Sequence, residues 1–156
     1  MLIPSAEESY VKGRRALSEG RGREAMALFE AAIRIAWRGR GSAPQARYLS
    51  YYGLCLAVVQ NENRESLRVC REAVTLEGYD PDIRFNLGRV LLHAGRRAEA
   101  HKCFVRSLAL GGDHPTIRSA LRSMGTRSRP AVPFLPRHNP LNVFLGRLRA
   151  GGRRPV

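Results

Sequence analysis

The stretch LGRVLLHAGRRAEAHKCFVRSL, residues 87–108, decides the fold. Counting from Gly88, a small residue follows twelve positions later (Ala100), a large apolar residue after sixteen (Phe104) and another small one after nineteen (Ser107), with Gly95 between the two halves. A glycine on one helix and small residues on a second allow two antiparallel helices to approach closely, and the aromatic residue fills the space toward a neighbouring pair. The stretch therefore predicts a helical hairpin.

The same order of residues occurs twice earlier in the chain. Each copy has an anchor glycine, then a small, a large and a small residue, and glycines or asparagines between the halves. The first copy consists of Gly13, Ala25, Phe29 and Ala32, and the second of Gly53, Ser66, Cys70 and Ala73. Because helical hairpins that repeat along a chain stack on one another, three copies predict a row of three hairpins.

Prolines preceded by capping residues mark where helices begin, since proline fits the first turn of a helix. We expect helix starts near residues 5, 43, 81 and 115, and Ser5 with Glu8 and Ser42 with Gln45 have capping-box spacing. The spacing from Gly13 to Gly53 is longer than that from Gly53 to Gly88, which predicts a long connection around residues 38–41.

Taken together, these residues resemble the tetratricopeptide repeat, whose pattern combines a large residue, Leu-Gly, an aromatic residue and alanines. The resemblance implies an all-α fold, an α-solenoid of antiparallel helix hairpins. We expect a repeat domain at residues 1–124, with repeats at about 5–39, 43–78 and 80–112 and a capping helix at 114–124.

The last 32 residues, 125–156, differ from the rest in composition. They hold seven arginines, no acidic residue and five of the nine prolines, and so carry half of the net charge of +14. We interpret them as a basic, proline-rich tail with a short amphipathic helix at about 140–149. Its apolar side chains are candidates for docking on this chain or on a partner, and the alternative is a disordered tail; they are Phe134, Leu135, Leu141, Phe144, Leu145 and Leu148.

Several classes of protein are not favoured by the sequence. The longest apolar run, residues 54–59, is far shorter than the roughly 20 residues of a membrane helix, and the N-terminus does not have the pattern of a secretory signal. The three cysteines and four histidines lack metal-ligand spacing, and no nucleophile motif or phosphate-binding loop is present. We expect a cytoplasmic protein with no catalytic residues, cofactor or metal.

The resemblance also implies where a ligand would bind, because the first helix of each repeat lines the concave side of the stack. Carried onto this sequence, the groove positions include Tyr10, Arg14, Arg47, Tyr51, Leu54, Phe85, Asn86 and Arg89. Arginines bind carboxylates, and aromatic rings supply contact area, so these residues suit a peptide with acidic groups and apolar anchors. Alternatively, the aromatic residues pack on the neighbouring helix and the arginines are only solvated.

We therefore expect a protein–protein interaction module, an adaptor or scaffold, with the tail as a second contact or a self-docking element. Two alternatives remain open at this point. One is a nucleic-acid-associated protein that uses the arginine-rich tail, although the body mixes acids with its arginines. The other is a chaperone for a specific client protein. The sequence indicates neither the partner nor the oligomeric state.

Overall fold

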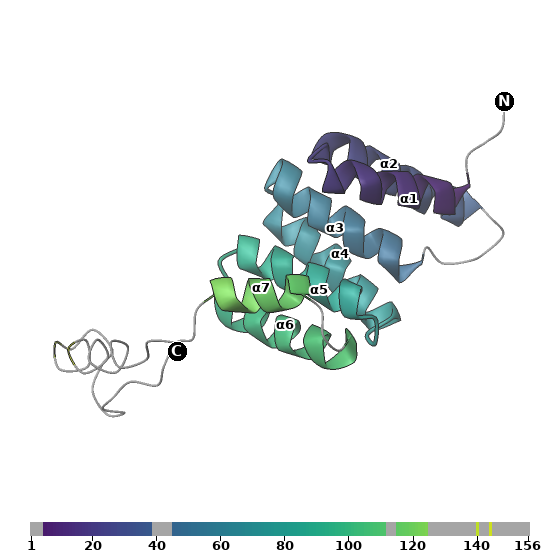
Figure 1. Cartoon of the computed structure of the whole chain (residues 1–156). Coiled ribbons are helices and arrows are strands. Elements are labelled where there is room, and N and C mark those ends of the chain that lie inside the picture. The colour runs from purple at the N-terminus through teal and green to yellow at the C-terminus, as the bar shows by residue number, and fades with distance from the viewer. Residues whose placement is uncertain (1–4, 39–44, 112–114, 125–139, 141–143, 145–156) are drawn as a thin grey trace. The chain divides into compact units, whose positions relative to one another are not determined.

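A computed structural model describes residues 5–38, 45–111 and 115–124, together with Pro140 and Phe144. This part of the chain contains seven helices and no strand (Figure 1). In chain order they are α1 (Ala6–Ser18), α2 (Gly22–Arg38), α3 (Ala46–Gln60), α4 (Asn63–Leu76), α5 (Pro81–His93), α6 (Arg97–Gly111) and α7 (Pro115–Ser123).

The helices form three hairpins that stack in chain order. The hairpins are α1 with α2, α3 with α4 and α5 with α6, while α3 also packs on α2 and α5, and α5 on α4. Figure 1 shows the three pairs following one another in a row, with α7 against the last pair. The predicted all-α stack of antiparallel hairpins is confirmed.

The anchor glycines lie where the two helices of each hairpin meet. A Cβ atom on Gly13 would lie 2.8 Å from Cε1 of Phe29, and one on Gly88 would lie 2.5 Å from Cε1 of Phe104. On Gly53 the nearest atom would be Sγ of Cys70, at 2.6 Å. Real Cβ atoms do not approach other atoms this closely, so a larger residue at any of the three positions would force a neighbouring group to move.

The nine small and large residues of the repeat pattern are fully buried on the second helices; they are Ala25, Phe29, Ala32, Ser66, Cys70, Ala73, Ala100, Phe104 and Ser107. Burying apolar surface of this kind is the main source of stability in a helical stack. The pattern therefore marks the core of each hairpin.

Each hairpin turn contains one residue with positive φ. These residues are Gly20 at 77°, Asn61 at 58° and Gly95 at 75°. Glycine adopts this left-handed conformation without steric cost, and asparagine tolerates it better than most residues. Gly20, Asn61 and Gly95 thus have the same conformational role in the three turns.

Two of the predicted helix starts are capped as expected. Ser5 Oγ accepts from the backbone N–H of Glu8 at 3.1 Å, while the Glu8 carboxylate accepts from the N–H of Ser5 at 3.2 Å. Asp80 caps α5 by accepting from the N–H groups of Asp82 and Ile83. With Pro81 in the first turn of α5 and Pro115 in that of α7, the starts near 5, 81 and 115 are confirmed.

The start predicted near residue 43 is wrong by three residues. Helix α3 begins at Ala46, and Gln45 is its N-cap residue without a side-chain cap bond. The Gln45 amide oxygen accepts from Nε of Arg47 instead, at 2.6 Å, so it is unavailable for the expected capping box. Ser42 lies outside the described residues. The long connection is confirmed, because residues 39–45 separate α2 from α3 whereas only residues 77–80 separate α4 from α5.

Helix α7 covers the core at the end of the third hairpin. Ile117 is fully buried in the same cluster as Phe104, and Ala120, Leu121 and Met124 pack against that cluster. The opposite face of α7 carries Ser119 and Arg122 among other polar residues. An amphipathic helix of this kind shields the last apolar surface of the stack from water.

Chain contacts divide the protein into two compact units, Met1–Met124 and Gly125–Val156. Only Pro140 and Phe144 of the second unit are described; both are helical, and the side chain of Phe144 is 62% exposed. The other residues predicted for tail docking lie outside the described part of the chain, as does most of the short helix expected at 140–149, and both expectations stay predictions.

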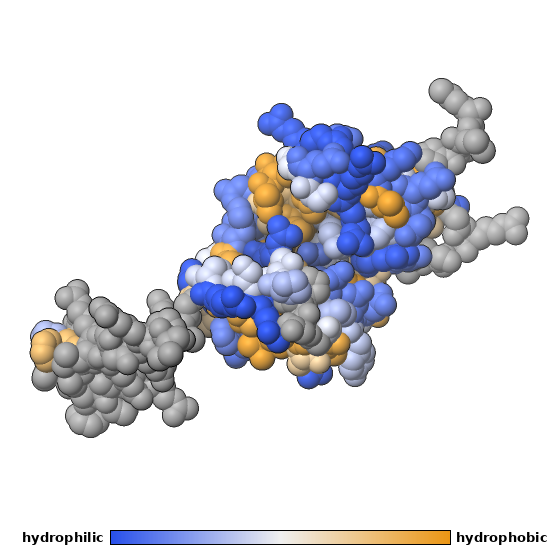
Figure 2. Space-filling model, in the orientation of Figure 1, coloured by the Kyte–Doolittle hydropathy of each residue, from blue (hydrophilic) through white to orange (hydrophobic). Residues whose placement is uncertain are grey.

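The exposed surface of the repeats that faces the viewer in Figure 2 is mainly hydrophilic, with apolar residues in small separate patches. Exposed apolar side chains include Val11, Val58 and Leu76, which lie on three different helices. Scattered residues of this kind are normal on a soluble surface.

Candidate binding surface on the first helices

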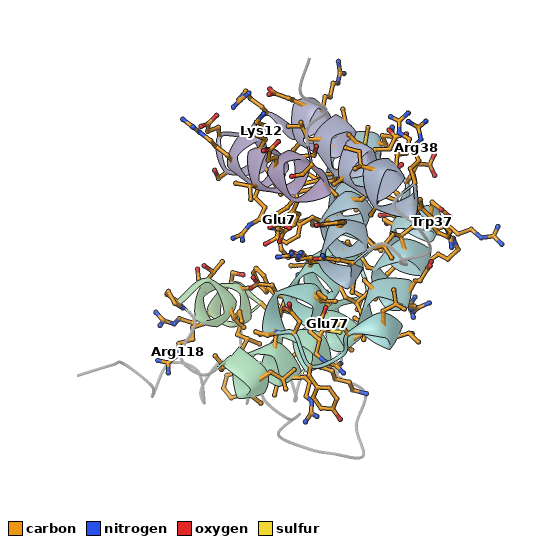
Figure 3. All side chains as sticks on the ribbon, turned by 90° about the vertical axis from the view of Figure 1, so that its right-hand side faces the viewer. Glu7, Lys12, Trp37, Arg38, Glu77 and Arg118 are labelled. Carbon is orange, nitrogen blue, oxygen red and sulfur yellow. The ribbon has the colours of Figure 1, made fainter. Side chains whose placement is uncertain are left out.

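Helices α1, α3 and α5, the first helices of the three hairpins, contribute a set of charged and aromatic side chains. We call this set the arginine–aromatic surface and define it as Glu7 and Arg14 of α1, Arg47 and Tyr51 of α3, and Asp82, Phe85 and Arg89 of α5. All seven are at least partly exposed. Figure 3 shows Glu7 on the side of α1 that faces the later helices.

Three of the eight predicted groove residues are buried. Tyr10 is 5% exposed, Leu54 1% and Asn86 2%. Leu54 belongs to the core cluster shared by α3 to α7, and Nδ2 of Asn86 donates to Oγ of Ser50 at 3.1 Å. These side chains support the surface from below and offer almost no area to a ligand.

The aromatic residues form two separate groups. The ring centroid of Tyr10 lies 5.1 Å from that of Tyr48, 5.6 Å from that of Tyr51 and 6.0 Å from that of Phe29. These ring contacts join α1, α2 and α3. Phe85 pairs with Phe104 of its own hairpin instead, at 5.5 Å. Of the three predicted groove aromatics, the structure therefore brings Tyr10 and Tyr51 together but places Phe85 apart from them.

Arg47 is fixed by contacts that cross from the first to the second hairpin. Its Nη2 donates to Oε2 of Glu7 at 2.7 Å, and the same oxygen accepts from the hydroxyl of Tyr48 at 2.9 Å. The guanidinium carbon also lies 5.0 Å from the ring centroid of Tyr10 and 5.5 Å from that of Tyr48, within the range of cation–π contact. Tyr48 is missing from the predicted groove because its contact with Glu7 spans 41 positions and leaves no local pattern.

Arg14 and Arg89 are placed differently, since neither forms an ion pair with a carboxylate in the described part of the chain. Arg14 lies over the rings of Tyr51 and Tyr10, at 5.6 and 5.9 Å. Arg89 lies over Phe85, at 5.9 Å. Each guanidinium is therefore within cation–π range of a ring, and no carboxylate among the described residues pairs with its charge.

The protein partly desolvates two groups of this surface, Tyr51 and Arg89. Desolvation raises the pKa of Tyr51 to about 12, with a smaller contribution from the negative charge of Asp82. Desolvation also lowers the pKa of Arg89, although this side chain is exposed to solvent. A charge that the protein partly desolvates is screened less by water than a fully solvated one.

The cysteines and histidines of the described part of the chain do not form a reactive site. Burial raises the pKa of Cys55 to about 11 and that of Cys70 to about 12, so both thiols stay protonated and weakly nucleophilic near neutral pH. No three His, Cys, Asp or Glu side chains among the described residues come together as metal ligands would. Within the same residues, no helix combines the length and apolar character needed to cross a membrane.

Comparisons with known proteins give their result at the level of structure. No model of a protein family matches the sequence, and no curated protein matches it significantly. The fold is similar to the tetratricopeptide repeat domain of Arabidopsis OM64, with a TM-score of 0.61 and 17% identity over 79% of this chain and 96% of that one.

Two further solved structures contain bound peptides or protein segments. The second tetratricopeptide domain of human RPAP3, in complex with an HSP70 peptide, has a TM-score of 0.57 and 16% identity over 79% of this chain and all of that one. PcrH of Pseudomonas aeruginosa, in complex with the chaperone-binding region of PopB, has a TM-score of 0.55 and 19% identity over 77% of this chain and 91% of that one. At these identities the likeness establishes the fold.

Proposed function

We propose that this chain, which has the fold of a tetratricopeptide repeat domain, is a non-catalytic interaction module that binds a segment of another protein across α1, α3 and α5. The observation that carries the proposal is the state of Arg14 and Arg89. Both are held against aromatic rings, and neither has a carboxylate partner among the residues that the structure describes.

The chemistry of the surface indicates what kind of segment fits. A cation that is partly desolvated, as Arg89 is, gains more from an acidic partner than a fully solvated one, because the surrounding water screens it less. The partly exposed rings of Tyr51 and Phe85 supply apolar contact beside the two arginines. We therefore propose a segment with carboxylates and apolar anchors.

Proteins of the same fold support an interaction role. Two similar structures are complexes, one with a peptide of HSP70 and one with a region of PopB. These partners belong to those proteins, and the partner of this chain is to be identified by experiment. The PcrH complex also supports the chaperone alternative, in which the bound segment belongs to a client protein.

The tail adds a second element to the proposal. Its seven arginines have the same sign of charge as Arg14 and Arg89, so electrostatics disfavour the tail as the occupant of the arginine–aromatic surface. We propose instead that residues 125–156 make a second contact with the same partner through their apolar and basic side chains.

Affinity capture from a cell extract, with the full-length chain as bait, tests the proposed surface. The double variant Arg14→Gln/Arg89→Gln should lose the captured partner. A matched control, Arg23→Gln/Arg106→Gln, removes the same charge from exposed positions on the second helices α2 and α6 and should retain it. Equal capture by both variants, or no reproducible capture by the unmodified protein, would contradict the proposal.

A further inference from the structure

The three arginines of the arginine–aromatic surface differ in how much of their hydrogen-bonding capacity remains. Arg47 donates through Nη2 to Glu7 at 2.7 Å and through Nε to Gln45 at 2.6 Å. Its guanidinium carbon also lies over the rings of Tyr10 and Tyr48. Two of the five N–H groups of Arg47 are therefore used, and its positive charge is already paired with the carboxylate of Glu7.

Glu7 is itself held in place. Its Oε2 accepts from both Arg47 and the Tyr48 hydroxyl, two donors that belong to the same helix, α3. The ring of Tyr48 is buried, so its hydroxyl is a fixed donor, and the hydrogen bond to Glu7 together with desolvation raises the pKa of Tyr48. A carboxylate held by two donors on one rigid helix is harder to displace than a solvated one.

Arg14 and Arg89 show the opposite situation on the same surface. Each lies over an aromatic ring and has no carboxylate within ion-pair distance among the described residues. The nearest acidic influence on Arg14 is the charge of Asp82, which acts without an ion pair. The surface is thus divided into a neutralised end at Glu7 and Arg47 and a cationic part at Arg14 and Arg89.

We infer that Glu7 is the specificity-determining residue of this surface. By occupying Arg47, Glu7 closes that end to acidic groups and directs the carboxylates of a bound segment to Arg14 and Arg89. This inference rests on the proposed function, because it concerns which part of the surface accepts the acidic groups of the partner. It also predicts a polarity for the bound segment, with its acidic residues away from the start of α1 and α3.

Fluorescence anisotropy at low salt with a labelled hexaglutamate peptide tests the inference on the full-length chain. Glu7→Gln frees Arg47 while keeping the size of the side chain, and we expect affinity for hexaglutamate to rise about threefold, as for a newly available exposed ion pair. Glu30→Gln on α2 removes the same charge from an ion pair with Arg34 that lies on one helix, and it controls for net charge.

A double-mutant cycle assigns the gain to Arg47. In the Arg47→Gln background, Glu7→Gln should give no increase beyond that of Glu30→Gln, because the cation that it frees is absent. If Glu7→Gln is unfolded by circular dichroism at the assay temperature, Glu7→Asp replaces it, since the shorter side chain withdraws the carboxylate from Arg47 and should act in the same direction.

Three results would overturn the inference: equal affinities for Glu7→Gln and Glu30→Gln, a gain that persists without Arg47, or no binding of hexaglutamate by any variant. These results are distinguishable from failure of the proposed function. If the partner is still captured in an Arg14- and Arg89-dependent way, the interaction role stands and only the role of Glu7 is lost.

Discussion

The second hairpin differs from the first and third in how its two helices approach each other. In the first and third hairpins, all close neighbours of a Cβ atom on the anchor glycine would be ring atoms of Phe29 or Phe104. In the second, a Cβ on Gly53 would meet Cys70 Sγ at 2.6 Å and also backbone atoms, Ser66 O at 3.2 Å and Cys70 N at 3.3 Å. The same glycine thus makes room for a large side chain in two hairpins and for a neighbouring backbone in the other.

The largest difference should appear when the residue opposite the glycine is truncated. Phe104→Ala should lower the free energy of unfolding by about 4 kcal/mol, because it leaves a large cavity beside Gly88, whereas Cys70→Ala should cost about 1 kcal/mol. Urea unfolding followed by circular dichroism measures both. Similar losses for the two variants would show that the second hairpin depends on its large residue as the third does.

Substituting alanine for the anchor glycine should instead destabilise the second hairpin more than the first. Gly53→Ala should lower the free energy of unfolding by about 3 kcal/mol, because the helix backbones cannot move aside. For Gly13→Ala we expect a net loss of about 1 kcal/mol. There the ring of Phe29 can shift, and the better helix propensity of alanine offsets part of the strain. Thermal unfolding of the two variants compares them directly. A greater loss for Gly13→Ala would contradict this account of the packing.

Only the second hairpin has an ionisable group opposite its glycine. Burial raises the pKa of Cys70 from its ordinary value of 9.0 to about 12. The folded state therefore keeps this proton where the unfolded state loses it, so stability from this group falls as pH rises from 9 toward 12. Between pH 9 and 11, we expect the free energy of unfolding of Cys70→Ala to fall by roughly 2 kcal/mol less than that of the unmodified protein.

This measurement requires a reducing agent and urea unfolding at each pH. Tyr51 and Cys55, whose pKa values are also raised by burial, remain in both proteins, so their contributions cancel in the comparison. Parallel pH profiles for the two proteins would argue against a buried neutral thiol at position 70.

The smallest effect concerns the turns. Asn61 takes the left-handed conformation that Gly20 and Gly95 adopt in the other hairpins. Asn61→Gly should therefore change the free energy of unfolding by no more than about 0.5 kcal/mol, whereas Gly95→Ala should cost about 1 kcal/mol. Thermal unfolding tests the pair, and a large loss from Asn61→Gly would indicate that the asparagine side chain has a role beyond its φ angle.

The sequence predicts the hairpins well because their determinants are local and periodic. The nine small and large residues of the repeat pattern, which the sequence predicts to pack between helices, are all buried. Gly20, Asn61 and Gly95 occupy the turns. The start of α3 is not predicted correctly, because Gln45 bonds to Arg47 through its side chain rather than capping the helix.

The candidate site is less predictable, because a first-helix position can face solvent or the next hairpin. Tyr10, Leu54 and Asn86 face neighbouring helices, which depends on how the hairpins pack and not on spacing within one helix. The link from Glu7 to Arg47 and Tyr48 joins residues about forty positions apart, so no local pattern reveals it.

Helix α7 also limits how many first helices the described stack presents. Its apolar side is used against the third hairpin and its other side is polar, so the described stack presents three first helices, α1, α3 and α5. Neighbouring packed helices lie about 10 Å apart, and an extended chain advances about 3.3 Å per residue. A segment bound across all three helices, as proposed above, would therefore need about six to nine residues, and shorter peptides should lose contact with one end.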